Sequence, residues 1–170
     1  MPVRLHRRPV SVSDARRDAP RLLIRADGAA RGNPGPASAG AVLIDLAGPS
    51  PYDPDAKPVA VIARPLGRRT NNFAEWTAVI LALERAAELG AAEVELVLDS
   101  KLVVEQLVGR WRVKEPSLVP LHGQARRLLR DLGAWTARHE GRWSNRAADA
   151  LANLALDDPE AAARLEVGAG

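Results

Sequence analysis

The order of apolar segments constrains the fold of this chain more than any other feature. Three short apolar runs, at residues 21–27, 39–46 and 59–64, have the length of strands and are separated by segments rich in glycine and proline. Residues 72–89 then place apolar side chains at helical spacing, and Gly90 is the stop expected at a helix C-terminus. The first half of the chain therefore predicts a hairpin, a third strand and a long helix.

The second half alternates helices with strands. The patterns predict a strand over 94–98, helices over 101–108 and 117–132, a short strand over 134–138, and a last helix over 145–156. Strands joined through helices pair in parallel, whereas a hairpin pairs antiparallel strands. We therefore expect an α/β fold, with one mixed sheet of five strands and helices on both of its faces.

The length of 170 residues fits one domain. We place it at residues 21–157, between a basic, flexible N-terminal arm over 1–20 and a loosely held C-terminal tail over 158–170. The arm carries five arginines against two aspartates, which suits a polyanionic partner. A solubilising arm and an organellar transit peptide are the alternatives for this segment.

Composition excludes several classes of protein. The chain has no cysteine, which excludes a disulfide framework, a cysteine-based zinc site and a cysteine nucleophile. It has no apolar run of 18 residues, and its N-terminus lacks the apolar block of a secretory signal. We therefore expect a cytoplasmic protein, without a membrane partner, that acts as a monomer.

Four acidic residues lie at strand ends or helix starts, where catalytic and metal-binding residues are common. Asp27 and Asp99 each follow an apolar strand, while Glu75 and Asp149 fall in the first turns of predicted helices. The helix dipole explains either helix-start acid alone, but not the two strand-end aspartates as well. Four carboxylates brought together repel one another, and a hard divalent cation relieves that repulsion. The set therefore predicts a site for Mg²⁺ or Mn²⁺, and two such ions can hydrolyse a phosphodiester.

Four segments in this order resemble type 1 ribonuclease H, in a form that lacks the family's basic protrusion. They are residues 27–36, 70–75, 98–100 and 145–153, and they fall on the predicted elements that the family would require. The resemblance covers about residues 21–157. It implies a ribonuclease H-like sheet with strand order 3-2-1-4-5 and an antiparallel second strand. It also implies endonucleolytic hydrolysis of the RNA strand of RNA–DNA hybrids, giving 5′-phosphate and 3′-hydroxyl ends.

The resemblance assigns roles to the acidic residues. Asp27, Glu75, Asp99 and Asp149 match a quartet that holds two Mg²⁺ ions in the presence of substrate, with Asp27 bridging both and Mn²⁺ as a substitute. His139 stands ten residues before Asp149 and matches a mobile histidine that assists product release or proton transfer. We therefore expect these five residues to form the catalytic site.

The resemblance also implies contacts with the nucleic acid. Asn33, Asn71 and Asn72 match positions that contact the minor groove of a hybrid, where the 2′-hydroxyl distinguishes RNA from DNA. Arg68 and Thr70 match a pocket for a phosphate of the DNA strand. On the residues alone, Asn71 and Asn72 could instead cap the helix beside them, and Arg68 could be a solvated loop residue.

The short link between residues 109 and 117 leaves no room for the basic protrusion that some members insert there. We therefore expect Trp111 and Lys114, within that link, to contact the DNA backbone, whereas Trp143 is interpreted as a packing residue. Two alternatives stay open: a non-catalytic module that binds hybrids, and another nuclease of the same superfold. The sequence also leaves open whether double-stranded RNA is a substrate.

Overall fold

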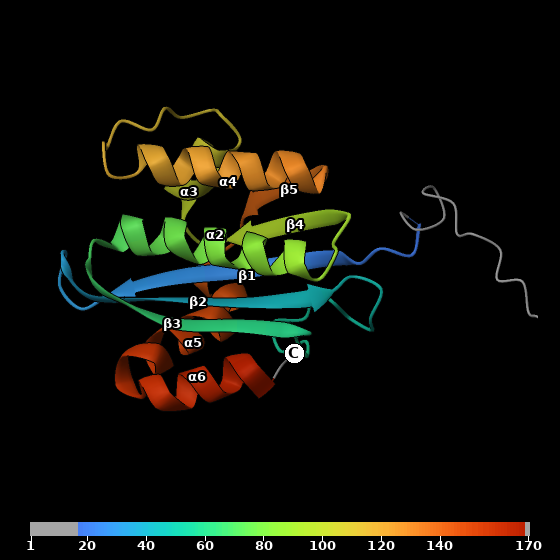
Figure 1. Cartoon of the computed structure of the whole chain (residues 1–170), viewed down its shortest axis with the longest axis horizontal. Helices are drawn as coiled ribbons and strands as arrows, with labels where there is room; N and C mark the ends of the chain where they lie inside the picture. Colours follow the sequence, from blue (N-terminus) through green and yellow to red (C-terminus); the bar gives the residue numbers. More distant parts are fainter. Residues whose placement is uncertain (1–16, 169–170) are drawn as a thin grey trace, which may run out of the picture.

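The computed structural model describes residues 17–168, which form one layered α/β unit (Figure 1). The predicted N-terminal arm lies almost entirely outside the described residues. Within them, no helix has the length and apolar character needed to cross a membrane. In chain order the elements are β1 (Arg21–Ala30), β2 (Gly35–Asp45), β3 (Ala60–Arg69), α2 (Asn71–Glu88), β4 (Glu93–Leu98), α3 (Lys101–Leu107), α4 (Val119–Leu132), β5 (Ala134–His139), a 3₁₀ turn η1 (Arg142–Asn145), α5 (Arg146–Asp157) and α6 (Pro159–Gly168).

The five strands form one sheet in the order β3-β2-β1-β4-β5. β2 pairs antiparallel with both β1 and β3, whereas β4 pairs parallel with both β1 and β5. This topology confirms the predicted fold class, strand order and orientation of strand 2. α3 and α4 connect the parallel pair β4 and β5, and α2 leads from β3 across to β4, which pairs parallel with β1.

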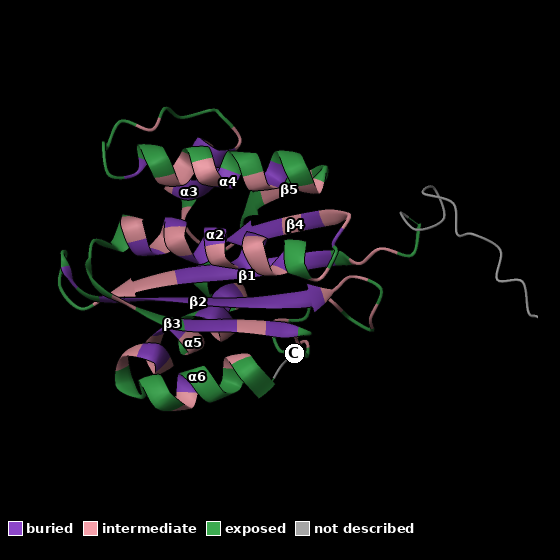
Figure 2. Cartoon of the chain, viewed as in Figure 1, coloured by how far each residue is buried: buried purple, intermediate pink, exposed green. Residues whose placement is uncertain are grey.

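Helices cover both faces of the sheet, with α2 and α4 on one side and α5 and α6 on the other (Figure 1). Alternate residues of β1 supply the two cores, because successive side chains of a strand point to opposite faces. Leu22 and Ile24 pack in the larger core with the fully buried Trp76 of α2. Leu23 packs in the smaller core against Leu151 of α5. β1 is therefore buried on both faces at the centre of the molecule (Figure 2).

The expectation of a loosely held tail is wrong for residues 159–168, which form α6 against β3. Ala162 is fully buried there. The Glu166 carboxylate accepts the backbone N–H of Ala63 at 2.7 Å and pairs with Arg64 at 2.9 Å. Because β3 is an edge strand, this contact occupies an N–H that another strand could otherwise bind. A short alanine-rich helix with a single buried residue leaves little apolar pattern in the sequence, so the helix was missed.

Candidate active site

Asp27 and Asp99 lie next to each other where β1 and β4 separate. The parallel pairing of these strands ends at Ala26 opposite Leu98, and the residue that follows each of these two is an aspartate. β1 itself continues for three residues beyond Asp27, paired with β2. The prediction that Asp27 ends its strand is therefore wrong, although its pairing with β4 does end there. The two carboxylates emerge at the sheet edge where α/β proteins commonly bind ligands.

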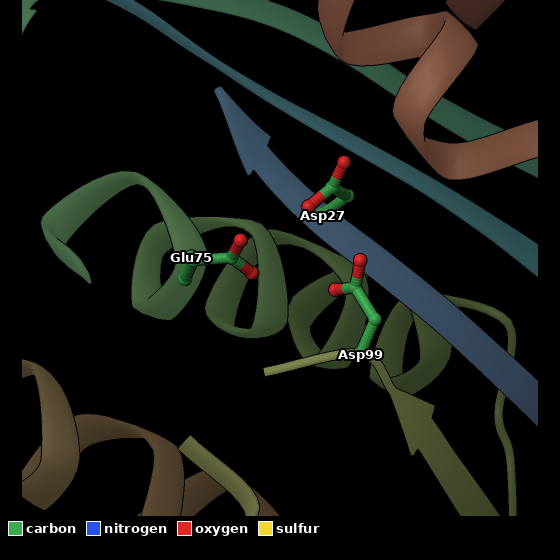
Figure 3. A group of neighbouring side chains, drawn as sticks. All are labelled: Asp27, Glu75 and Asp99. Atoms are coloured by element: carbon green, nitrogen blue, oxygen red, sulfur yellow. The ribbon is translucent and has the colours of Figure 1, made fainter. Parts of the chain in front are cut away.

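Glu75 reaches this point from α2 because of Gly28. A Cβ at Gly28 would overlap the backbone of Ala74 and Glu75, so only glycine allows the N-terminal part of α2 to pack this close to β1. The prediction that Glu75 falls in the first turn of its helix is wrong, because α2 begins at Asn71 and Glu75 lies just beyond that turn. The carboxylate oxygens of Asp27, Glu75 and Asp99 can all lie within 4.8 Å of one another. Figure 3 shows the three side chains turned toward one another from β1, α2 and the end of β4. The structure thus brings three of the four predicted acids into one cluster.

Asp149 approaches from the opposite face of the sheet on α5. Gly40 is the cross-strand partner of Asp27, and a Cβ there would overlap the backbone of Ala148 and Ala152 in α5. A glycine next to Asp27 in the chain and a glycine opposite it in the sheet therefore admit one helix on each face. Asp149 lines the same cleft as the other three acids, although it lies outside their 4.8 Å cluster.

Asn145 fixes the start of α5 beside β1. It is buried, and its side-chain amide donates a hydrogen bond of 2.9 Å to the carbonyl of Ala26. Ala26 is the residue directly before Asp27. This bond therefore ties the helix that carries Asp149 to the strand that carries Asp27, over 119 residues of sequence separation.

The four carboxylates carry an unrelieved repulsion. Burial raises the pKa of Asp27 to about 7, and the charges of Asp99 and Asp149 add to the increase. Burial, followed by the charge of Asp27, raises the pKa of Glu75 to about 10. Within residues 17–168, no lysine or arginine forms an ion pair with any of the four acids. An all-oxygen cluster that lacks a protein cation fits a hard divalent metal ion.

The acids lie in a cleft of about 510 Å³. α2 and the segment after β4 contribute amide and hydroxyl side chains to its lining, and the wall on the Asp149 side, formed by η1 and α5, carries two arginines. Besides the four acids and backbone from β1, the lining side chains are Asn71, Asn72, Ser100, Arg142 and Arg146. The cleft therefore combines a metal-binding floor with groups that donate hydrogen bonds to a polar, negatively charged ligand.

Thr70, rather than the asparagines after it, caps α2. Its hydroxyl accepts the backbone N–H of Phe73 at 3.2 Å. The alternative in which Asn71 and Asn72 cap this helix is therefore wrong, and both side chains line the cleft instead. Asn33 lies in the turn between β1 and β2, where its side-chain oxygen accepts the backbone N–H of Asn71 at 3.1 Å. Asn33 does not line the cleft itself but ties its own turn to the start of α2.

His139 is the last residue of β5 and is exposed. Its Nε2 atom lies 3.1 Å from the backbone carbonyl of Asp99. A ring with the proton on Nε2 therefore donates to this carbonyl. His139 therefore contacts the backbone of one member of the acidic cluster, Asp99, but does not line the cleft.

The predicted DNA contacts lie on two exposed segments. Arg68 is exposed near the end of β3. Trp111 is 45% exposed in the link between α3 and α4, and the ammonium of Lys101 lies 5.9 Å from its ring centroid. Trp111 and Lys114 line a second groove, and Asn72 lines both this groove and the acidic cleft. The groove therefore continues from the cleft along the surface.

Arg142 and Arg146 line the cleft although the sequence patterns did not indicate them, and Trp143 differs from its expected role. The interpretation of Trp143 as a packing residue is wrong, since it is 73% exposed in η1. One signal was present in the sequence: Arg146 is the first residue of α5, where a positive charge opposes the helix dipole. A residue that breaks a local rule in this way is a candidate for function.

Comparisons with known proteins agree with this geometry. A family model described as "Reverse transcriptase-like" matches residues 25–155. The chain is 46% identical over 132 residues to ribonuclease HI of Halobacterium salinarum, covering 78% of this chain but only 62% of that relative. It is 33% identical to ribonuclease H of Chromohalobacter salexigens, covering 89% of this chain and 94% of the relative. Both relatives are named for one enzyme class.

Solved structures show the same likeness. The crystal structure of RNase H1 from Halobacterium salinarum has a TM-score of 0.74 and 45% identity, covering 81% of this chain and 98% of that one. LC11-RNase H1, solved in complex with an RNA/DNA hybrid, has a TM-score of 0.73 and 34% identity, covering 81% of this chain and 98% of that one.

Proposed function

The chain belongs to the type 1 ribonuclease H family, and from this premise we propose that it cuts the RNA strand of RNA–DNA hybrids endonucleolytically, leaving 5′-phosphate and 3′-hydroxyl ends. The observation that carries the proposal is the single cleft that four carboxylates line together with Asn71 and Asn72. The acids fit phosphodiester hydrolysis with water as the nucleophile, and the amides fit recognition of the ribose.

We propose that Asp27, Glu75, Asp99 and Asp149 hold two Mg²⁺ ions when substrate is bound, with Mn²⁺ as a substitute. Burial first, and then the charges of neighbouring acids, raise the pKa values of Asp27 and Glu75, and a bound cation would offset both effects. When bound, such ions neutralise the phosphate and lower the pKa of a water molecule. Asp27, with Glu75 and Asp99 on one side and Asp149 on the other, is the central member of the set.

His139 is proposed to move a proton or to assist product release. Its exposed ring lies one hydrogen bond from the backbone of Asp99, so it can act on a group in the cleft without being a permanent part of its lining. An imidazole ring can both donate and accept a hydrogen bond through its two nitrogens, which suits both roles.

The substrate contacts follow the exposed side chains around the cleft. Asn71 and Asn72 are proposed to contact the minor groove and the 2′-hydroxyls, with Asn33 as a further contact beside them. Arg68 and Thr70 are proposed to bind a phosphate of the DNA strand; the Thr70 hydroxyl, which accepts from Phe73, still has its own proton to donate.

The groove beyond Asn72 is proposed to take the DNA backbone through Trp111 and Lys114. An indole packs on sugar and base surfaces, and an ammonium group neutralises phosphate. The hybrid duplex is therefore the proposed partner. A module that binds hybrids without cutting them would have no need of four clustered acids, and Mg²⁺-dependent turnover of a labelled hybrid separates the two functions.

The Asp99→Asn variant tests the proposed role of the quartet. We expect it to lose about 10³-fold in turnover, since a metal site that lacks one carboxylate loses several kcal/mol of transition-state stabilisation. Its circular dichroism spectrum should match that of the wild type. Asp131→Asn, an exposed position on α4 away from the cleft, is the matched control and should cut normally. Wild-type turnover by Asp99→Asn would rule out the proposed mechanism.

A further inference from the structure

Two arginines on the Asp149 side of the cleft have no role in the proposed chemistry. Arg142 lies in η1, and Arg146 is the first residue of α5. Both line the cleft. Within residues 17–168, no carboxylate forms an ion pair with Arg142, although both guanidinium groups share the cleft with four acids.

The guanidinium of Arg146 is held on two sides. Its carbon lies 4.0 Å from the ring centroid of Trp143, and one of its nitrogens donates to the Trp143 carbonyl at 3.2 Å. Another nitrogen donates to the Asp55 carboxylate at 2.6 Å. Asp55 lies in the long loop between β2 and β3 and is 76% exposed, so water screens this ion pair and little is lost when it opens.

The positions of Arg146 and Trp143 favour a role beyond the fold. A positive charge at the first residue of a helix opposes the helix dipole. The indole of Trp143 is 73% exposed and lies against the Arg146 guanidinium rather than in the core. Such a combination of an oriented guanidinium and an exposed aromatic ring beside a cleft is typical of a site for an anion that arrives from outside.

The charges in the cleft indicate which anion this is. Two divalent cations would neutralise the negative charge of the four carboxylates. The positive charges of Arg142 and Arg146 would then be left over in the cleft. A planar guanidinium binds a phosphate through two parallel hydrogen bonds. If the scissile bond of the RNA strand lies over the acids, as the proposed function requires, the neighbouring phosphates of that same strand come closest to this wall.

We propose that Arg142 and Arg146 bind a backbone phosphate of the cleaved strand, next to the scissile one, and that Arg146 exchanges Asp55 for this phosphate when the substrate binds. The inference rests on the proposed function. Trp143 keeps the Arg146 guanidinium in place throughout, so that binding costs little side-chain entropy. Asp55 lowers the affinity of the free site by competing for Arg146.

Four variants test the site by steady-state kinetics. Arg142→Ala and Arg146→Ala should each raise KM about tenfold with kcat within about twofold, as expected for loss of one charged hydrogen-bonding contact. Each should also reduce the salt dependence of hybrid binding by about one counterion. Asp55→Asn should lower KM by only about two- to threefold, because the exposed ion pair that it removes is weak. An unchanged KM would overturn the exchange but not the phosphate contact. Arg21→Ala is the matched control, because Arg21 pairs with Glu93 at 2.7 Å at the start of β1, away from the cleft, and should leave KM unchanged.

The signs of these effects separate a phosphate site from a structural role. If Asp55 and Arg146 only held the fold together, then Asp55→Asn and Arg146→Ala would both raise KM, and this result would overturn the exchange. Arg146→Lys keeps the charge and the helical position without the planar fork, so it should recover only part of the lost affinity. Full recovery by lysine would contradict a fork-shaped phosphate contact.

A neutral linkage in the substrate identifies the phosphate itself. We would place single methylphosphonates, each on a 2′-deoxy residue, along the cut strand of a hybrid with one cleavage site. The matched 2′-deoxy phosphate hybrids serve as references. Wild-type kcat/KM should fall about tenfold at one linkage beside the cut, whereas Arg146→Ala should be almost insensitive there.

Equal losses in the two proteins at every linkage would overturn the inference while leaving the proposed function intact. Failure of the wild type to cut the unmodified hybrid in Mg²⁺ would instead overturn the proposed function, and this inference with it.

Discussion

The Asp27→Asn variant should lose about 10³-fold in hybrid cleavage and yet resist unfolding better than the wild type when no divalent cation is present. Asp27 is 6% exposed and lies among three other acids. An asparagine has the same shape without the charge, so it removes both the desolvation of a carboxylate and its repulsion with Asp99, Glu75 and Asp149. Function and stability of the metal-free protein are therefore expected to change in opposite directions.

The pH dependence of this effect follows from the raised pKa of Asp27, which is about 7 instead of 3.8. Between these values the native state retains a proton that the unfolded state has released, so the stability of the wild type falls as pH rises through this range. Glu75, with its pKa raised to about 10, continues the fall at higher pH. Asp27→Asn removes the Asp27 contribution and also relieves Glu75.

The measurement is urea unfolding in EDTA at pH 4 and pH 8. At pH 8 the variant should exceed the wild type by an amount on the order of 3 kcal/mol in free energy of unfolding, and at pH 4 the two should nearly agree. Adding Mg²⁺ at pH 8 should stabilise the wild type more than the variant, because binding to the native state stabilises it. A variant less stable than the wild type at pH 8 in EDTA would show that repulsion among the acids is not the dominant effect.

Gly28→Ala and Gly40→Ala should each destabilise the protein and reduce its cleavage activity. An added methyl group at either position overlaps helix backbone, at Ala74 and Glu75 of α2 for Gly28 and at α5 for Gly40. Relief requires the helix to move away from β1 or β2, which displaces Glu75 or Asp149. Overpacking of this kind costs about 1–3 kcal/mol or more, and a shift of about 1 Å in a catalytic group can cost about 10²-fold in rate.

Gly123→Ala is the matched control, since Gly123 lies in α4 and a Cβ there meets nothing within 4 Å. It should stabilise the protein by about 0.4–1 kcal/mol and leave activity unchanged. Thermal unfolding and kcat together report both effects. If Gly28→Ala or Gly40→Ala behaved like Gly123→Ala, the close approach of the helices would not be what assembles the quartet.

The role of these glycines marks the limit of what sequence patterns could predict. The order of strands and helices and the acids that follow them were predictable, because hydrophobic period and helix stops are local properties. The segment between the predicted strands over 21–27 and 39–46 is rich in glycine and proline and predicts a long connection, whereas only residues 31–34 lie outside β1 and β2. A glycine required for close packing of a helix looks the same in sequence as a glycine required for a turn.

Other differences also depend on tertiary contacts. Thr70 rather than Asn71 or Asn72 caps α2. All three adjacent residues are of types that cap helices, so the sequence alone could not indicate which of them does so. The exposure of Trp143 depends on how η1 leads into α5, which is a tertiary feature. In a sequence, an isolated aromatic residue is most simply interpreted as buried. The side chains that line the cleft beside the acids were thus only partly predictable.

Cleavage of matched duplexes tests the central claim most directly. The wild-type protein would be incubated with RNA–DNA, RNA–RNA and DNA–DNA duplexes of one sequence, each strand end-labelled, in Mg²⁺, in Mn²⁺ and in EDTA. We predict cutting of the RNA strand of the hybrid in the presence of metal, with 5′-phosphate and 3′-hydroxyl ends, an intact DNA strand and no cutting in EDTA. A hybrid left intact in both metals, or DNA–DNA cut as fast as the hybrid, would contradict it.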